Sequence, residues 1–314
     1  MRAFVFPGQG SQSIGMGKAL AETWPAARAV FEEVDDALGQ KLSTLMWAGS
    51  EAELTLTANT QPALLAVSMA AVRVLEIEGV PLAGTAAYVA GHSLGEYSAL
   101  AAAGAFSLAD AARLLRIRGE AMQAAVPVGT GAMAALLGLD YDVVAGIAAE
   151  AAGDEVCNAA NDNQPGQVVV SGHRAAVDRA VEIARARGAK RAVMLPVSAP
   201  FHCALMQPAA DRMAEALAAV AISAPAVPVV ANVLAAPIVD PDEIRRRLVE
   251  QVTGTVRWRE SIGWLSANGV DTYLELGAGK VLSGLVRRID KAASVASFGA
   301  PDDLPGLRAL LGEG

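Results

Sequence analysis

The chain has 314 residues, of which 53% are hydrophobic and 18% are charged, and its formal net charge is −8. A chain of this length can bury a substantial core, either as one large domain or as a domain that carries an insertion. The negative charge opposes binding to nucleic acid, which is itself a polyanion, so we expect no nucleic-acid partner.

The first residues read as a strand, RAFVF at 2–6, and not as a secretory leader. Two cysteines, Cys157 and Cys203, are too few for a disulfide framework. We therefore expect a cytoplasmic protein in which both thiols pack as small hydrophobic side chains.

The next elements mix strands and helices, which is typical of an α/β layered domain. They are a glycine-containing loop after the first strand, a helix around 63–76, a strand at 85–90 and a helix at 107–123.

From residue 131 the elements become shorter and follow the order βαββαβ, which is typical of a ferredoxin-like unit. They are a strand at 132–139, a helix at 141–151, strands at 155–161 and 167–172, a helix at 173–188 and a strand at 190–196. Longer α/β elements resume after about residue 197. We predict an α/β fold with a large subdomain (1–126 and 198–314) and an inserted ferredoxin-like small subdomain (127–197). One continuous α/β domain is the alternative.

An uncharged run at 216–239 has the length of a membrane span. Three prolines interrupt it, and proline breaks a helix. We interpret the run as a helix end, a turn and a buried strand at 227–233, and we expect no contact with a membrane.

The stretch VAGHSLGEY at 89–97 places Ser93 between Gly91 and Gly95. A G-x-S-x-G motif between a strand and a helix forms a nucleophile elbow, in which small neighbours allow a sharp turn that exposes the hydroxyl. The N-terminus of the following helix favours an oxyanion formed beside that hydroxyl. We infer a nucleophilic Ser93; a serine in a tight turn with no chemical role is the alternative.

A nucleophilic serine needs a base, and histidine is the usual base near neutral pH. Of the three histidines, His92 is adjacent to Ser93 and should point away from the hydroxyl, and His173 begins a helix of the inserted unit. His202 lies where the chain re-enters the large subdomain. By elimination His202 is the candidate base, and a core histidine with satisfied hydrogen bonds is the alternative.

The helix at 107–123, wound at about 100° per residue, has one apolar face. Arg118 falls within that face. A buried guanidinium needs a carboxylate partner, because burying it alone is costly. The partner is either a buried Asp or Glu or a substrate carboxylate held by two hydrogen bonds, and the helix pattern leaves both open.

Five short motifs occur in a characteristic order and at characteristic separations. They are PGQGSQ at 7–12, GHSLGEY at 91–97, RIRGEAMQ at 116–123, SAPFHCALM at 198–206 and LVEQVTGTVRW at 248–258. Over essentially its whole length the chain resembles the malonyl-CoA:acyl carrier protein transacylase family of bacterial fatty acid synthesis.

The resemblance implies a hydrolase-like α/β large subdomain with a ferredoxin-like insertion. It also implies an acyltransferase that moves a malonyl group from its coenzyme A thioester to the pantetheine thiol of acyl carrier protein. The transfer would pass through a malonyl-serine in a ping-pong cycle, with no cofactor and no metal.

The resemblance further assigns roles to individual residues. Ser93 would be the nucleophile, His202 the base and Arg118 the clamp on the malonyl carboxylate. The backbone N–H groups of Gln9 and Leu94 would form the oxyanion hole. The main-chain carbonyl of Gln251 would orient the histidine.

Two positions depart from the family pattern. Ala278 stands where we expect proline, which bears on loop stiffness and not on chemistry. Phe201 stands where some members carry serine, and it would crowd the α-carbon of the acyl group and disfavour methylmalonyl over malonyl. A phenylalanine that only packs in the core is the alternative.

Docking of an acidic carrier protein to an acidic enzyme requires a local basic surface. Lys190 and Arg191, in RARGAKR at 185–191, are our first choice, and Arg287 and Arg288 are the second. A solvated helix end explains the cluster equally well.

Three other functions are compatible with part of this pattern. A discrete acyltransferase that serves a polyketide synthase shares every motif. A serine esterase or thioesterase has no use for Arg118, and a non-catalytic carrier-binding module has no use for Ser93 and His202.

Overall fold

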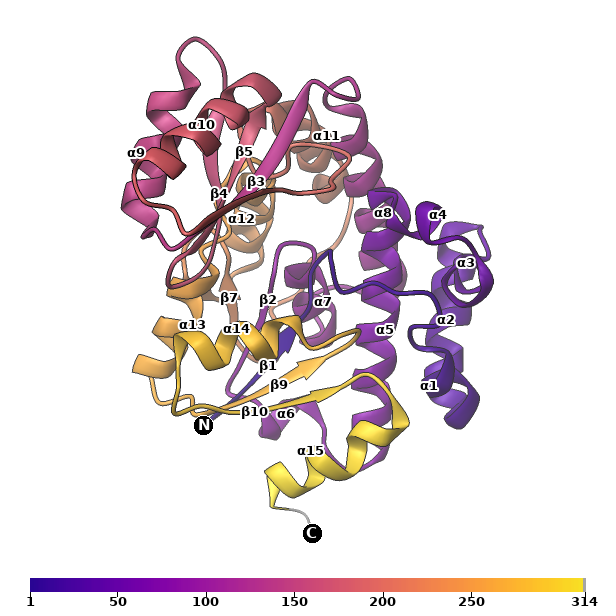
Figure 1. Ribbon diagram of the computed structural model, residues 1–314. Coiled ribbons are helices and arrows are strands. Elements are labelled where there is room, and N and C mark those ends of the chain that lie inside the picture. Colours follow the sequence, from indigo (N-terminus) through magenta and orange to yellow (C-terminus); the bar gives the residue numbers. More distant parts are fainter. Residues whose placement is uncertain (313–314) are drawn as a thin grey trace.

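The computed structural model describes residues 1–312, and its largest sheet has six strands in the order β10-β9-β1-β2-β7-β8 (Figure 1). All neighbouring strands are parallel except β7 and β8, which are antiparallel. The strands are β1 (Arg2–Phe6), β2 (Tyr88–Gly91), β7 (Val229–Ala231), β8 (Ala236–Ile238), β9 (Thr272–Leu276) and β10 (Ser294–Phe298).

Both faces of this sheet are covered, as a parallel sheet requires. Ala3 and Val5 of β1 pack on one face against α13 (Trp258–Ala267) and α14 (Val281–Ile289), whereas Phe4 and Phe6 belong to the main core on the other face. The remaining helices of the large subdomain are α1 (Lys18–Thr23), α2 (Pro25–Leu38), α3 (Leu42–Ala48), α4 (Glu51–Thr55), α5 (Thr57–Ile77), α6 (Leu82–Thr85), α7 (Gly95–Ala102), α8 (Leu108–Ala124), α11 (Gln207–Ala218), α12 (Pro241–Thr253) and α15 (Leu304–Leu311), with 3₁₀ turns η1 (Ala204–Met206) and η2 (Pro301–Asp303).

Helix α5 is long and apolar enough to cross a membrane by length and composition, but 83% of its most apolar stretch is buried inside the protein. It runs beside α8 through the middle of the molecule (Figure 1). This burial is that of a core helix. The uncharged run at 216–239 contains the end of α11, β7 and β8, each too short to span a bilayer.

A second sheet is antiparallel, with the order β4-β5-β3-β6. Its elements follow one another as β3 (Gly131–Leu137), α9 (Tyr141–Ala152), β4 (Cys157–Gln164), β5 (Gln167–His173), α10 (Arg174–Ala186) and β6 (Arg191–Met194). The predicted ferredoxin-like unit inserted in an α/β fold is confirmed. The subdomain boundaries near residues 126 and 198 stay a prediction.

Side chains along β3 alternate between the two faces of the small sheet. Ala132, Ala134 and Leu136 pack against α9 and α10, whereas Met133 and Ala135 belong to the main core on the opposite face. One face of the small sheet is therefore covered by its own helices, and the other faces the large subdomain.

Hydrogen bonds join the small sheet to the segment after α12. The Val256 N–H donates to the Ala160 carbonyl and the Asp162 N–H donates to the Val256 carbonyl, both at 2.9 Å. Arg259 also pairs with Asp162 at 2.8 Å. These contacts fix the end of α12, which carries Gln251, against the small subdomain.

Several strands differ by a few residues from their predicted bounds, and the differences at β2 and β4 have a visible cause. β2 begins at Tyr88 and not at 85, because residues 82–85 form the turn α6, in which Gly84 has a φ of +87°. β4 runs to Gln164 and not to 161, with register shifts that accommodate its polar residues. Cys157 and Cys203 are buried free thiols, as predicted.

Candidate active site

The tight turn at Ser93 depends on the two flanking glycines. A Cβ added to Gly91 would lie 1.9 Å from the backbone of Gly95, and a Cβ added to Gly95 would lie 2.2 Å from the carbonyl oxygen of Phe6. Ser93 itself has a φ of +54°, a conformation that L residues rarely adopt. The strand, turn and helix therefore form the predicted elbow geometry and direct the Ser93 side chain into a cavity.

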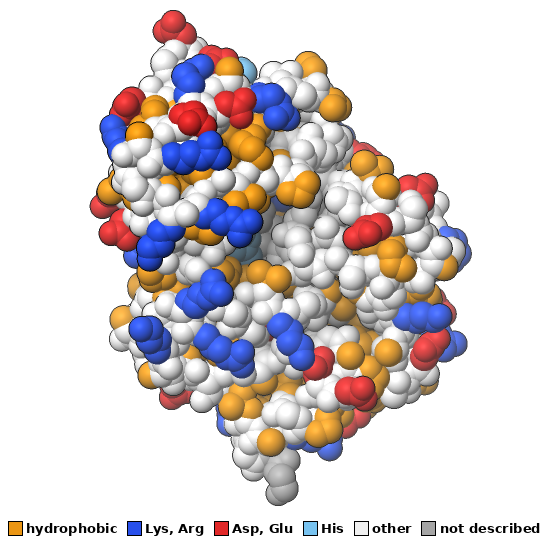
Figure 2. Space-filling view, in the orientation of Figure 1, with side chains coloured by type: hydrophobic (Ala, Val, Ile, Leu, Met, Phe, Trp, Pro, Cys, Tyr) orange, Lys and Arg blue, Asp and Glu red, His pale blue; other side chains and the backbone are white. Residues whose placement is uncertain are grey.

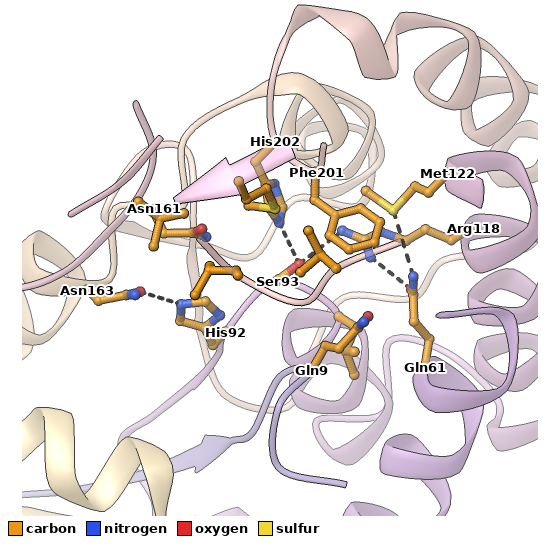
Figure 3. A pocket seen from close by; sticks show the side chains of 15 residues that line it. Gln9, Gln61, His92, Ser93, Arg118, Met122, Asn161, Asn163, Phe201 and His202 are labelled. Atoms are coloured by element: carbon orange, nitrogen blue, oxygen red, sulfur yellow. Dashed lines mark hydrogen bonds between the residues drawn. The ribbon is translucent and has the colours of Figure 1, made fainter. Parts of the chain in front are cut away.

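His202 lies against this hydroxyl. The Ser93 Oγ is 2.7 Å from His202 Nε2 (Figure 3). His202 Nδ1 is 2.9 Å from the main-chain oxygen of Gln251. A carbonyl oxygen only accepts, so Nδ1 carries the proton and Nε2 is free to accept one from Ser93. The geometry is that of a serine–histidine pair oriented by a main-chain carbonyl.

The protonation state of His202 also suits a base. Burial lowers the pKa of His202 to about 3, and the positive charge of Arg118 acts in the same direction. The imidazole is therefore neutral near pH 7. Like Ser93, His202 has a positive φ, +58°, so both partners have an uncommon backbone conformation.

Arg118 is 1% exposed and also lies beside Ser93. Its guanidinium donates from Nη1 to Gln61 Oε1 at 2.8 Å, and from Nη2 to Gln251 Oε1 at 2.8 Å and to Ser93 Oγ at 3.2 Å. Within residues 1–312 it forms no ion pair, and its Nε has no partner. The sequence left two possible partners for Arg118, a buried Asp or Glu and a substrate carboxylate. Within the described residues no Asp or Glu side chain binds it directly.

A polar network beneath the elbow was not predicted from the sequence. Asn232 Oδ1 accepts from the Ser93 N–H at 2.7 Å, and Gln251 Nε2 donates to the Ser93 carbonyl at 3.0 Å. Glu96 accepts from the Asn232 N–H at 3.0 Å and from Gln251 Nε2 at 2.8 Å. These bonds hold both backbone groups of the strained serine. The only local sequence signal was for Asn232, the one polar residue in the apolar run at 227–233.

Gln9 and Leu94, the expected oxyanion donors, both line the cavity with Ser93. In the part of the chain that is described, neither backbone N–H has a hydrogen-bond acceptor. The Gln9 side chain is held by Thr57, whose hydroxyl donates to Gln9 Oε1 at 2.9 Å. Two free donors beside a nucleophile can stabilise an oxyanion.

The cavity extends to both sides of Ser93 (Figure 3). One end contains Arg118, Gln61, Met122 and Phe201, and Phe201 is 9% exposed. The other end lies against the small sheet and contains His92, Asn161 and Asn163, and Leu195 and Val197 also line the cavity. The first end is small and cationic, and the second leads along the groove between the subdomains.

The remaining histidines have other partners. His92 Nε2 lies 2.8 Å from Asn163 Oδ1, and burial lowers the pKa of His92. His173 caps α10 and its Nδ1 accepts from the Val156 N–H at 2.9 Å. Both arrangements agree with the expectation that neither is the base. Among residues 1–312 no group of three His, Cys, Asp or Glu side chains could hold a metal ion.

The basic residues singled out for docking are all exposed. Lys190 and Arg191 stand at the start of β6, whereas Leu195 and Val197 of the cavity wall come after its last residue, Met194. Arg287 donates to the Val295 carbonyl at 3.0 Å. Arg288 donates to Gln164 at 3.4 Å, one residue after Asn163 of the cavity. The contact with Gln164 places Arg288 near the Asn163 end of the cavity, and β6 connects Lys190 and Arg191 to the cavity wall.

Comparisons with known proteins give a consistent result. Residues 3–297 match the family described as "Acyl transferase domain". The chain is 47% identical over 303 residues to the malonyl CoA-acyl carrier protein transacylase of Bacillus subtilis, covering 96% of this chain and 94% of that protein.

Two solved structures are similar over nearly the full length. The crystal structure of acyl-carrier-protein S-malonyltransferase from Bartonella henselae superposes with a TM-score of 0.96 at 59% identity, covering 99% of each chain. A malonyl-transacylase in complex with a type II polyketide synthase acyl carrier protein superposes with a TM-score of 0.94 at 44% identity, covering 99% of each chain.

Proposed function

The chain belongs to the acyl transferase domain family, and we propose that it transfers a malonyl group from malonyl-CoA to the pantetheine thiol of acyl carrier protein. The observation that carries this proposal is Arg118, a buried guanidinium 3.2 Å from Ser93 Oγ with no ion-pair partner among the described residues. A site built this way favours an acyl group that ends in a carboxylate. An esterase for neutral acyl groups has no use for such a cation.

In the first half-reaction, Ser93 attacks the thioester carbonyl of malonyl-CoA while its proton passes to His202 Nε2. The Gln251 carbonyl keeps the imidazole in the required tautomer. The oxyanion is stabilised by the N–H groups of Gln9 and Leu94 and by the N-terminus of α7. The C–S bond then breaks, the coenzyme A sulfur takes the proton from His202, and a malonyl ester remains on Ser93.

The second half-reaction repeats these steps with a different thiol. The pantetheine thiol of acyl carrier protein gives its proton to His202, and the sulfur attacks the ester carbonyl in the same oxyanion hole. The Ser93 oxygen leaves and recovers the proton from His202. One site therefore serves both substrates in a ping-pong cycle, and the steps use only groups of the chain itself.

Selectivity follows from the small end of the cavity. We propose that Arg118 holds the malonyl carboxylate, with Gln61 and Gln251 keeping the guanidinium in place. Phe201 lines the same end and would crowd a methyl branch on the α-carbon. The site would thus prefer malonyl to both acetyl and methylmalonyl groups.

Acyl carrier protein would dock on the basic surface near the groove. Figure 2 shows Lys and Arg side chains over the small subdomain and over α13 and α14, on both sides of a hollow between the subdomains. Within residues 1–312, Arg185 and Arg187 are paired with Glu182 and Glu150, whereas Lys190 and Arg191 form no ion pair. We propose these two as the main contacts, with Arg287 and Arg288 on the opposite side.

The carrier proteins served are most simply those of bacterial fatty acid synthesis in the cytoplasm. A polyketide carrier is the second candidate, because a relative at 44% identity is solved in complex with one. Comparing the second half-reaction with purified carriers of both kinds separates the two roles.

The decisive experiment is intact-mass analysis after mixing with malonyl-CoA. We expect one malonyl adduct that maps to Ser93 and is absent from Ser93→Ala. Labelling that persists in the variant, or that maps to Cys203, would refute the proposal.

A further inference from the structure

Two opposite charges are buried beneath Ser93 without touching each other. Arg118 and Glu96 are each 1% exposed. Arg118 donates only to amide and hydroxyl oxygens, and Glu96 accepts from the Asn232 N–H and the Gln251 side chain. A buried charge without a compensating partner is strongly destabilising, so the partner of each has to be identified.

The side-chain amide of Gln251 connects them. Its Oε1 accepts from Arg118 Nη2 at 2.8 Å and its Nε2 donates to Glu96 Oε2 at 2.8 Å. In the opposite orientation the amide NH₂ would face the guanidinium and the carbonyl would face the carboxylate, which places like partial charges together. The two ions therefore fix and polarise the amide between them.

We infer that Glu96 is the resident counter-charge of Arg118. While the acyl pocket is empty, Glu96 balances the positive charge of the guanidinium through Gln251. In the acyl-enzyme the malonyl carboxylate balances that charge instead. Glu96 is thus a positioning residue that acts through Gln251 and Arg118. The second part of this inference rests on the proposed malonyl transfer, whereas the first concerns the free enzyme.

The environment of Glu96 supports this assignment. Burial raises the pKa of Glu96 to about 7, while its two N–H donors and the charge of Arg118 act to lower it. The carboxylate is therefore ionised above neutral pH only because these neighbours stabilise it. Glu275, a second buried carboxylate, instead accepts from the Leu282 and Ser283 N–H groups at the start of α14.

The substitution Glu96→Gln isolates the charge from the hydrogen bonds. Both donors reach the same oxygen, Oε2, so the glutamine carbonyl can accept both and its NH₂ takes the place of Oε1. In the free enzyme Arg118 then lacks a counter-charge. In the malonyl-enzyme the malonyl carboxylate restores it.

The test compares thermal unfolding at a pH of about 8, where Glu96 is ionised, with and without malonyl loading. We expect Glu96→Gln to lower the Tm of the free enzyme by about 5 °C or more. Malonyl loading should raise the Tm of this variant by more than it raises that of the wild type. The KM for malonyl-CoA should fall several-fold, while that for acetyl-CoA stays the same.

A double-mutant cycle with Arg118→Ala decides between charge balance and simple structural support. Without Arg118, Glu96 is an unpaired buried carboxylate, so Glu96→Gln should leave the Tm unchanged or raise it. The matched control Glu275→Gln should lower the Tm equally with and without Arg118. An equal loss for Glu96→Gln in both backgrounds would overturn the inference.

The double-mutant cycle still tests the inference if the Glu96→Gln variant does not fold. If Glu96→Gln alone is unfolded, recovery of folded protein in the double variant supports the inference, and an unfolded double variant overturns it. The cycle in the free enzyme needs no substrate. A missing malonyl adduct on the wild-type Ser93 would therefore refute the proposed function without affecting this result.

Discussion

Replacing Arg118 by alanine tests the carboxylate clamp directly. The guanidinium is 1% exposed and reaches to 3.2 Å from Ser93 Oγ, so it is shielded from water at the point where we propose that the acyl group is attached. Its loss would leave the malonyl carboxylate unpaired in this environment. We expect a cost of about 2–5 kcal/mol, which corresponds to a roughly 30-fold to several-thousand-fold loss of malonyl transfer.

The substitution has a second effect that must be separated from the first. Gln61 Oε1 and Gln251 Oε1 both accept from Arg118, and each loses that donor. An unsatisfied buried acceptor costs about 1–3 kcal/mol of stability. This loss is the same for every substrate. Acetyl-CoA has no carboxylate and therefore serves as the internal reference. In Arg118→Ala, acetyl transfer should fall little, or even rise relative to malonyl transfer.

The assay measures malonyl and acetyl transfer to acyl carrier protein for the wild type and Arg118→Ala, with circular dichroism as a check of folding. Arg113→Ala is a matched control on the same helix, because Arg113 is exposed and pairs with Asp110. It should leave both activities intact. A parallel loss of malonyl and acetyl transfer in a destabilised Arg118→Ala protein would refute the clamp.

Three further predictions follow from the site. Because burial and the charge of Arg118 lower the pKa of His202 to about 3, the rate of Ser93 malonylation at saturating malonyl-CoA should stay nearly constant from a pH of about 8 to about 5. Saturation removes the change in KM that we expect when Glu96, with a pKa of about 7, gains its proton in the same range. An acid limb near the ordinary histidine pKa of 6.5 would contradict this assignment. Phe201→Ser should raise methylmalonyl-CoA use relative to malonyl-CoA by about 10-fold or more, and an unchanged ratio removes Phe201 from the account of selectivity. Reversing Lys190 and Arg191 to glutamate should slow transfer to the carrier protein and spare malonylation by malonyl-CoA, measured as separate half-reactions; an equal loss in both would argue against docking there.

Features with a local physical cause could be predicted from the sequence. The first strand, RAFVF, and the βαββαβ order follow from hydrophobic patterning and element length. The elbow followed from small residues at two fixed positions, and the structure gives the reason, since a Cβ at Gly95 would lie 2.2 Å from the Phe6 carbonyl oxygen. The burial of Arg118 followed from its place in the apolar face of α8. Each of these signals lies within a few turns of one element.

The partners of Arg118 could not be predicted in the same way. Its acceptors come from α5, from the elbow and from α12, which are 57, 25 and 133 residues away along the chain. Gln61 follows three other polar residues at the start of α5, and Asn232 is the one polar residue in the predicted strand at 227–233. The neighbouring sequence does not distinguish a polar residue that joins such a buried network from one that is exposed to solvent.

Glu96 shows most clearly why local rules do not suffice here. An acidic residue in the first turn of a helix is favourable in itself, so the helix α7 gives no reason to look for another role. Its burial and its bond to Gln251 arise only when α12 packs against the elbow. Gln251 in turn holds His202 through its main chain, and Ser93 and Arg118 through its side chain. The two residues with positive φ in the site are therefore held by one distant glutamine, whose orientation depends on the tertiary fold.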